Sequence, residues 1–293
     1  MTKNRRTLAL LEALMVTVIW SSSFVVVKFG LETLGPLTIA GLRYLLGGMA
    51  LAPFLLLKRG NRKPIPKNLW PRLALIGISS YTIGNGALFW GLKYIPATTG
   101  SFLMGLIPLF VMIGGAIFLK EIPTNWQGIG VFISLTGSAI FFSGGLKAGE
   151  PLGISILVLG LVGFMAFSLL GRGIARERLL DTLVLTTVPL IIGGLITICI
   201  ALIVEGIPQF TTSSLWVIAW LALVNTSLGY LLYNQALREL TALEMNMVMN
   251  LTPLFTAFIS WILLAERLDL MQGIGLIVMI AGVVLVQRNS QKE

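Results

Sequence analysis

The feature of this sequence that most restricts its fold is a succession of long apolar stretches joined by short polar connections. A helix needs about 20 mostly apolar residues to cross the hydrocarbon core of a bilayer. Ten stretches meet this requirement, five in each half, so we expect an all-α membrane protein with ten transmembrane helices. The stretches span residues 8–29, 36–57, 70–92, 97–119, 125–144, 152–172, 182–204, 214–237, 243–264 and 269–287.

Composition supports a membrane location and argues against several kinds of chemistry. Hydrophobic residues make up 56% of the chain and charged residues 11%, whereas about 25% of the residues in a soluble domain are charged. The chain has no histidine and one cysteine, Cys199, so the commonest metal ligand and any intrachain disulfide are missing. We expect no metal site and no cofactor. The first apolar stretch follows a basic N-terminus, as in a signal peptide, but it is long enough to span and lacks a clear cleavage site, so we interpret it as a retained helix.

The basic residues indicate how the helices are oriented. If the N-terminus is cytoplasmic, sixteen of the 21 Lys and Arg residues fall in cytoplasmic segments, three fall in outer loops, and Lys28 and Arg43 lie inside apolar stretches. Cytoplasmic connections are enriched in Lys and Arg, so we predict that both termini of this inner (plasma) membrane protein are cytoplasmic. The charges are scattered over short segments and do not form one patch suited to nucleic acid.

The two halves of the chain are related by an internal repeat. At a shift of about 145 residues, the C-terminal parts of the halves align without a gap, and they share proline, glutamate, glutamine and glycine positions. We therefore divide the chain into two five-helix repeats, residues 1–145 and 146–293. The matched segments are Pro108-Leu109-Phe110 with Pro253-Leu254-Phe255, Glu121 with Glu266, Gln127-Gly128-Ile129-Gly130 with Gln272-Gly273-Ile274-Gly275, and Gly137 with Gly282.

The repeat also predicts a mechanism. With five helices in each repeat, the first half begins inside the cell and the second begins outside, so the halves are inverted relative to each other. Inverted repeats are typical of transporters, where they provide two similar packings that open to opposite sides around a site near the midplane. We therefore expect alternating access between the two halves.

The motifs resemble those of a known family, the drug/metabolite transporter superfamily, in its EamA branch. The resemblance rests on Trp20-Ser21-Ser22-Ser23-Phe24 and on the repeated pattern that runs from Pro108 to Gly137 and from Pro253 to Gly282. It implies a cavity lined by the first, third, fourth, sixth, eighth and ninth helices, with the fifth and tenth packed peripherally. It also implies export, since similar bacterial members are often exporters of amino acids or metabolites.

Aromatic and amide side chains recur at four-residue steps inside the apolar stretches. Tyr81 and Asn85 share one helix face, and so do Tyr230 and Asn234. Aromatic faces can hold an ammonium and amides a carboxylate, so these pairs suit an amino acid; ordinary interface tyrosines are the alternative interpretation. Packing positions are likewise the alternative for the methionines and serines. The predicted cavity lining is Trp20, Ser23, Tyr81, Asn85, Ser101, Met104, Met165, Ser168, Tyr230, Asn234, Asn246 and Asn250.

The ninth stretch carries Asn246, Asn250 and Pro253 on one face, and its repeat mate carries Ser101 and Pro108 in the same arrangement. Amides at this depth either line a substrate path or join helices by hydrogen bonds. Each proline removes a backbone donor, so we expect matched kinks that serve in gating. Transmembrane helices also tolerate proline without any mechanical role, which is the alternative.

A few ionisable residues lie within or beside the stretches. Glu12 suits either a proton relay or simple snorkelling to the cytoplasmic interface. Arg43 needs an anionic or carbonyl partner at its depth, and we favour structural anchoring over contact with a substrate carboxylate. Glu121 and Glu266 follow matched apolar runs, so the repeat favours a role in fixing loops.

These features predict an exporter of amino acids or similar small metabolites that works by facilitated alternating access. The alternatives are a proton-coupled multidrug or metabolite antiporter of the same fold and, less favoured, an anion or nucleotide-sugar carrier. An intramembrane enzyme would need paired carboxylates, histidines or an activated nucleophile, and a channel would need a continuous polar stripe. The expected partners are a small-molecule substrate and lipid, with a homodimer left open.

Overall fold

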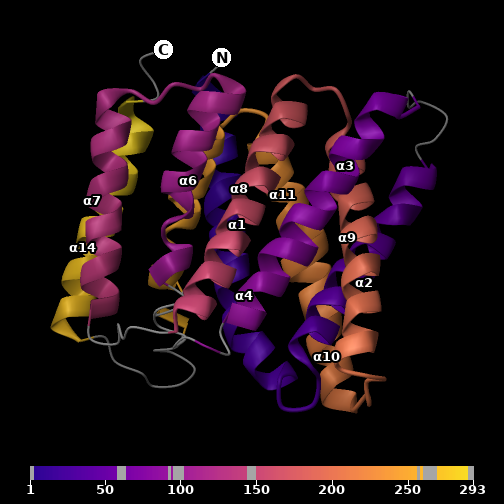
Figure 1. Cartoon of the computed structure of the whole chain (residues 1–293). Coiled ribbons are helices and arrows are strands. Elements are labelled where there is room, and N and C mark those ends of the chain that lie inside the picture. Colours follow the sequence, from indigo (N-terminus) through magenta and orange to yellow (C-terminus); the bar gives the residue numbers. More distant parts are fainter. Residues whose placement is uncertain are drawn as a thin grey trace.

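A computed structural model describes residues 3–57, 64–91, 94, 102–143, 150–255, 258–259 and 269–289. Throughout this part of the chain the regular structure is helical and contains no strand, so the all-α prediction is confirmed (Figure 1). The elements are α1 (Lys3–Gly30), α2 (Pro36–Leu57), η2 (Lys67–Leu69), α3 (Trp70–Gly77), η3 (Ile78–Gly84), α4 (Asn85–Gly91), α6 (Ile107–Gly114), η4 (Gly115–Leu119), α7 (Asn125–Phe142), α8 (Pro151–Arg176), α9 (Thr182–Val204), α10 (Thr212–Trp220), η6 (Leu221–Leu228), α11 (Gly229–Ala236), α12 (Ala242–Met249) and α14 (Leu270–Asn289).

Six helical stretches of the described chain are long and apolar enough to cross a membrane. The remaining four predicted stretches contain α1, the continuous run from α3 through η3 to α4, α7, and α12. The number of ten spans therefore stays a prediction, although every predicted stretch overlaps a helix. The six are Pro36–Leu55, Phe102–Leu119, Pro151–Arg176, Thr182–Val204, Thr212–Ala236 and Leu270–Arg288.

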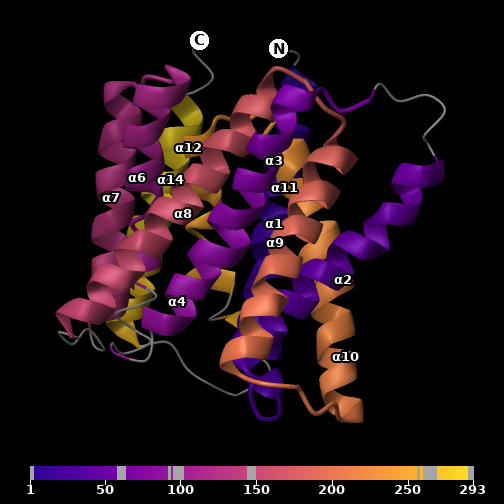
Figure 2. The same cartoon turned by 45° about the vertical axis from the view of Figure 1, so that its right-hand side comes forward.

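Helices at matching positions of the two halves pack directly on each other. The two most extensive helix pairings are α7 with α14 and α2 with α9, and in each pair the members are separated by the repeat shift of about 145 residues. The first pair lies at one side of the molecule and the second at the other (Figures 1 and 2). This arrangement leaves α1, α8 and α11 between the two pairs.

Glycines make the close approach of α7 and α14 possible. A Cβ atom added to Gly137 would lie 2.4 Å from the backbone nitrogen of Met279, and one added to Gly275 would lie 2.8 Å from the carbonyl oxygen of Gly137. Because backbone atoms occupy these positions, no side-chain movement can make room for a larger residue. Gly130, Gly137, Gly275 and Gly282 thus mark helix packing, as small residues do in membrane interfaces, whereas nothing lies within 4 Å of a Cβ atom added to Gly128 or Gly273.

The fourth and ninth predicted stretches are interrupted at the same point of the repeat. Residues 102–104 are helical, Gly105 and Leu106 form a turn, and α6 then begins with Pro108 in its first turn. In the second half α12 ends at Met249, a turn follows, and residues 252–255, which include Pro253, are helical again. Proline is accepted in a first turn because the nitrogen there has no intrahelical partner. Each proline therefore begins a new helical segment after a break.

Two π-helical segments also occupy matching places in the halves. The segments η3 and η6 interrupt the third and eighth predicted stretches and are separated by about the repeat shift. A π segment shifts the backbone hydrogen bonds to the i→i+5 pattern and is often found at functional sites. Nothing in the hydropathy pattern predicted them.

Candidate functional site

Six aromatic rings from both halves of the chain form one buried group, which we call the aromatic cluster: Trp20, Tyr44, Tyr81, Phe167, Tyr230 and Tyr233. The Tyr81 ring lies 4.5 Å from that of Tyr44 and 5.2 Å from that of Tyr230, centroid to centroid. Trp20 stacks on Tyr233 at 5.6 Å. These separations are those of favourable aromatic pairs. The cluster brings together the predicted residues Trp20, Tyr81 and Tyr230.

Trp20 is held in the cluster by a contact with η6. Its indole Nε1 donates a hydrogen bond of 2.9 Å to the backbone carbonyl of Asn225. Asn225 is fully buried, and its own side-chain nitrogen donates to the carbonyl of Ile19 and to Ser22 Oγ. Trp20 and Asn225 therefore join α1 to the π segment of the eighth stretch.

A polar group borders the aromatic cluster at Ser168. The Ser168 hydroxyl oxygen accepts a hydrogen bond of 3.2 Å from the hydroxyl of Tyr233 and one of 2.6 Å from Nδ2 of Asn246. Asn246 also donates to the carbonyl oxygen of Ala242 in its own helix. Two predicted site residues, Ser168 and Asn246, are thus in direct contact, and α8, α11 and α12 meet there.

The other predicted amides make separate contacts in this conformation. Asn250 Nδ2 donates to Ser134 Oγ at 3.0 Å, on the peripheral helix α7, although the four-residue spacing predicted a shared face with Asn246. The backbone keeps the helical relation between the two positions, since the Asn250 nitrogen donates to the Asn246 carbonyl at 3.0 Å. The side chains nevertheless contact different neighbouring helices, α7 for Asn250 and α8 for Asn246. Asn234 donates to Thr186 Oγ1 on α9, and Asn85 donates to the carbonyl of Ser80 within η3.

The two predicted methionines and Ser101 lie away from the cluster or beyond what the structure describes. Met165 is partly buried and its sulfur faces Gly114 of α6, where a Cβ atom would lie 2.8 Å away. Met104 is partly buried in the short helical turn before the break. Ser101 and Glu266 lie outside the described residues.

Arg43 of α2 reaches α1 on one side and η6 on the other. Its Nε donates to Thr226 Oγ1 at 3.2 Å, its Nη1 donates to Ser23 Oγ at 3.0 Å, and its Cζ lies 5.1 Å from the centre of the Tyr44 ring. The anionic or carbonyl partner expected from the sequence is not found among the described residues. Two hydroxyls and an aromatic face hold this guanidinium instead.

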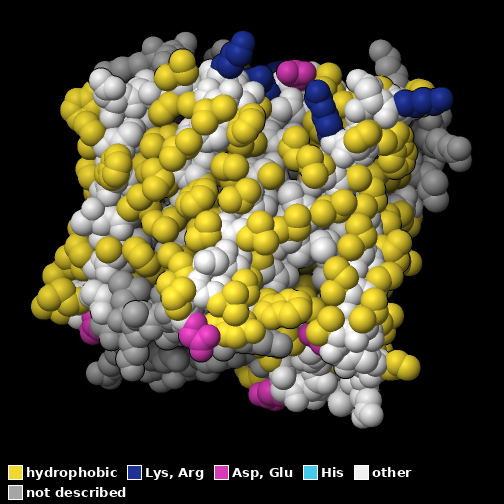
Figure 3. All heavy atoms as spheres, viewed as in Figure 1, with side chains coloured by type: hydrophobic (Ala, Val, Ile, Leu, Met, Phe, Trp, Pro, Cys, Tyr) yellow, Lys and Arg dark blue, Asp and Glu magenta, His cyan; other side chains and the backbone are white. Residues whose placement is uncertain are grey.

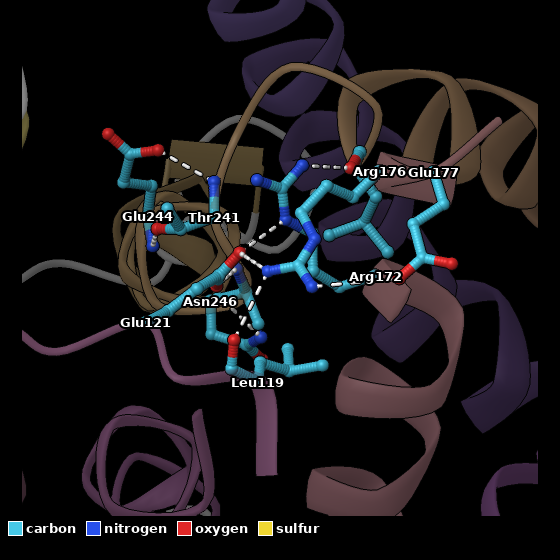
Figure 4. A network of polar contacts seen from close by, with 10 residues as sticks. Leu119, Glu121, Arg172, Arg176, Glu177, Thr241, Glu244 and Asn246 are labelled. Atoms are coloured by element: carbon cyan, nitrogen blue, oxygen red, sulfur yellow. Dashed lines mark hydrogen bonds and ion pairs between the residues drawn. The ribbon is translucent and has the colours of Figure 1, made fainter. Parts of the chain in front are cut away.

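At the end of the molecule where both termini lie, ion pairs join the helix ends (Figure 4). We call this set the inner ion-pair layer. The Glu121 carboxylate accepts from Arg172 Nε at 2.8 Å and lies 3.6 Å from Arg176 Nη1, and it also accepts from the backbone nitrogen of Ala242 at 3.4 Å. The pairs in the layer are Glu121 with Arg172 and Arg176, Arg6 with Glu244, and Arg178 with Glu239.

Two cavities border this layer. One of about 200 Å³ is lined by Arg5, Glu12, Arg178, Arg238 and Glu239, together with Leu8, Ala9 and Gln235. The other, of about 320 Å³, surrounds Glu121 and Arg172. Glu12 therefore faces a polar cavity at the end of α1, beside a second carboxylate and several arginines. Among the described residues, no group of three His, Cys, Asp or Glu side chains could hold a metal ion.

Several residues of the aromatic cluster, its surroundings and the inner ion-pair layer were not predicted as site residues from the sequence. Tyr44 and Phe167 gave no four-residue pattern of their own, and Asn225 was hidden by the π segment, which breaks the helical period around it. Arg172 and Arg176 were counted only as cytoplasmic charges. Their spacing of four residues at the end of α8 was the available signal for a paired site.

Comparisons with known proteins agree with this architecture. The model of the EamA-like transporter family matches the chain twice, over residues 7–143 and 151–288. An uncharacterized transporter of Archaeoglobus fulgidus is 28% identical over 91% of this chain and 93% of its own length. The uncharacterized inner membrane transporter YedA of Escherichia coli K12 is 27% identical over 92% of this chain and 87% of its own.

Two further relatives add a named cargo and a fold. An S-adenosylmethionine/S-adenosylhomocysteine transporter of Chlamydia trachomatis is 25% identical over 85% of this chain and 79% of its own. One solved crystal structure, 14% identical, superposes with a TM-score of 0.81 over 97% of this chain and 98% of that chain, so the two share a fold. Because the family model matches both halves of a chain with several membrane-spanning helices, this protein is a multi-pass membrane transporter that belongs to the EamA-like transporter family.

Proposed function

We propose that this transporter exports amino acids, or small metabolites that carry an amino-acid group, by facilitated alternating access. The observation that carries the proposal is the aromatic cluster with its polar border at Ser168 and Asn246, built from both halves of the chain. In transporters with inverted repeats the substrate binds where the halves meet. Rocking one half against the other would open this cluster to either side.

The chemistry of the cluster suits an amino acid. Stacked tyrosine and tryptophan rings attract an ammonium group through their faces and also accept an apolar side chain. The hydroxyls of Ser168 and Tyr233 and the amide of Asn246 supply hydrogen bonds for polar groups of the substrate. In the present packing these side chains bond to one another, so a substrate would replace contacts that the protein otherwise makes with itself.

A related transporter supports the choice of substrate class. The Chlamydia trachomatis relative is named as a transporter of S-adenosylmethionine and S-adenosylhomocysteine, and both compounds contain an α-amino-acid group. Proton-coupled exchange of a drug or metabolite is the alternative within the same fold, and Glu12, which borders a polar cavity, is the residue that would take part in it.

The proposed orientation decides which end of the molecule faces the cytoplasm. The Lys and Arg side chains visible in Figure 3 gather at the end where Figure 1 has both termini. Since cytoplasmic ends are rich in Lys and Arg, we assign this end and the inner ion-pair layer to the cytoplasm. With the layer paired, the cytoplasmic entrance is closed, and loading from the cytoplasm would require these pairs to separate.

The proposal is tested by flux in proteoliposomes with a panel of radiolabelled amino acids, comparing the wild type with Ser168→Ala. Removal of the hydroxyl deletes the acceptor shared by Tyr233 and Asn246 and should raise KM about tenfold. Ser155→Ala is the matched control, since Ser155 lies on the same helix with its side chain exposed. Absence of flux for the whole panel, or equal flux in both variants and wild type, would contradict the proposal.

A further inference from the structure

Arg43 carries a positive charge inside an apolar stretch, and the described part of the chain supplies no matching negative charge. It is partly buried, and none of the carboxylates in the described part of the chain lies within 4 Å of its guanidinium. Its hydrogen-bond partners, Ser23 and Thr226, are neutral hydroxyls. A charged group at this depth is costly unless it is paired, so residues of this kind in membrane spans mark substrate or ion pathways.

A carboxylate from α9 lies at the start of α2, the helix that carries Arg43, but it is already occupied. Glu205, at the end of α9, accepts hydrogen bonds of 2.8 Å from the backbone nitrogens of Leu37 and Thr38 and one of 2.7 Å from Thr38 Oγ1. Its carboxylate therefore satisfies the exposed donors of the first turn of α2. Glu205 thus caps the start of α2, whereas no carboxylate of the described residues pairs with the guanidinium further along this helix.

The guanidinium still has bonding capacity. Nε and Nη1 each make one hydrogen bond, whereas Nη2 makes none with the described part of the chain. Nη2 is also not among the described buried atoms that lack a hydrogen-bond partner. Arginine presents planar, parallel donors that match the two oxygens of a carboxylate. One carboxylate could therefore add a charge-assisted contact without displacing Ser23 or Thr226.

The position of Arg43 connects this charge to the aromatic cluster. Its guanidinium lies over the ring of Tyr44, and that ring is 4.5 Å from Tyr81 and 6.2 Å from Tyr230. A ligand with a carboxylate at Arg43 would thus reach the rings with the rest of its structure. An amino acid suits this geometry, because its carboxylate lies only a few atoms from its ammonium group and its side chain.

We propose that Arg43 is the carboxylate-recognition residue of the transport site and makes the protein selective for carboxylate-bearing substrates. Ser23 and Thr226 orient its guanidinium, and the substrate carboxylate supplies the missing counter-charge. This inference rests on the proposed function, in which the aromatic cluster receives the remainder of the substrate.

Binding to the purified full-length protein provides the test, because it does not depend on transport. The probes are L-phenylalanine and L-methionine, each compared with its methyl ester, which keeps the ammonium and side chain but removes the negative charge. The melting temperature of the wild-type protein in detergent is measured against ligand concentration. The acid should give the half-maximal shift at about a tenfold lower concentration than its ester. In Arg43→Gln the preference should fall to about twofold or less, and Arg43→Lys should keep part of it, since it retains the charge and loses the planar donors.

The matched control is Arg288→Gln, which removes one positive charge from the exposed end of the peripheral helix α14 and should leave the preference unchanged. Equal binding of acid and ester by the wild type, or an unchanged preference in Arg43→Gln, would overturn the inference. If Arg43→Gln does not yield a monodisperse protein, Arg43→Lys is measured instead. An Arg43→Lys protein that prefers the acid as strongly as the wild type does would contradict a contact through the planar donors of the guanidinium. Flux measured beside binding separates the two proposals. If the protein prefers the acid over the ester but shows no flux, the transport proposal alone is overturned. If it shows flux but no preference for the acid, the Arg43 inference alone is overturned.

Discussion

At the residue scale, the most informative contacts are those in which a predicted side chain meets one that the sequence had not singled out. Trp20 is such a case, because its indole N–H bonds to the carbonyl of Asn225 inside η6 and its ring packs on Tyr230 and Tyr233. The residue thus combines ring packing with one buried hydrogen bond. Buried indoles usually find such a partner, and losing it leaves an unpaired acceptor.

Trp20→Phe separates these two contributions. The variant keeps an aromatic ring but removes the donor to Asn225, so we expect a loss of about 1–3 kcal/mol in the free energy of unfolding. Reversible unfolding in mixed detergent and SDS micelles measures it. Trp216→Phe, at an outward-facing position with 73% of the side chain exposed, should change stability by less than about 0.5 kcal/mol. Equal losses in the two variants would mean that the Asn225 contact contributes nothing.

At the element scale, matched helices of the two repeats determine how closely the halves can pack. The α7–α14 pair depends on glycines because backbone atoms of each helix lie where the partner's Cβ atoms would be. Interhelical attraction in a membrane depends on such close packing, since lipid is as apolar as the helix surface. The helix breaks before Pro108 and Pro253 are matched in the same way, which is the arrangement expected of elements that move symmetrically.

Gly137→Ala tests the close contact between α7 and α14. The new methyl carbon would lie 2.4 Å from the Met279 backbone nitrogen, so the helices must separate, and we expect about 1–3 kcal/mol of destabilisation in the same micelle assay. Gly128→Ala on the same helix is the control, because nothing lies within 4 Å of its added Cβ. A Gly137→Ala protein as stable as the Gly128→Ala protein would disprove the steric explanation.

At the scale of the whole molecule, the inner ion-pair layer ties together helices from both halves. Arg6 of α1 pairs with Glu244 of α12, and Glu121 of the first half pairs with Arg172 and Arg176 of α8. Alternating access requires two global states that differ in which side is sealed, and contacts made in only one state shift the equilibrium between them. We expect this layer to stabilise the state that is closed to the cytoplasm.

Glu121→Gln removes the charge that both arginines share. We expect the closed state to lose about 1–2 kcal/mol, which corresponds to a 5- to 30-fold larger cytoplasm-open population. The readout is the rate at which an impermeant maleimide labels Met245→Cys, a fully buried position on α12, in a Cys199→Ser background. Glu177→Gln is the control, because Glu177 lies outside the layer, is largely exposed, and among the described residues forms an ion pair only with Arg176, at 3.8 Å. An unchanged labelling rate in Glu121→Gln would exclude a gating role for this carboxylate.

The sequence predicted the helical class, the helix positions and the matched segments well, because apolar length and residue-type repeats are properties of the chain itself. The site residues stay predictions, and the structure shows only which of them lie together. Ser168, Asn246, Tyr81, Tyr230 and Trp20 were found from depth and periodicity, and they lie in or beside one cluster. Asn250 contacts Ser134 of the peripheral helix α7, because periodicity relates positions along one helix and does not say which neighbouring helix each side chain meets.

The sequence by itself determined that this protein is a helical membrane protein made of two related halves, because about 20 apolar residues are what a bilayer requires and a shared residue pattern reveals duplication. The tertiary structure alone decided which polar groups meet. The pairing of Glu121 with Arg172, the hydroxyls around Arg43 and the contact of Asn225 with Trp20 join residues 20 to 205 positions apart. Such partners depend on the rotation and depth of each helix and on local π segments and breaks, which hydropathy does not encode.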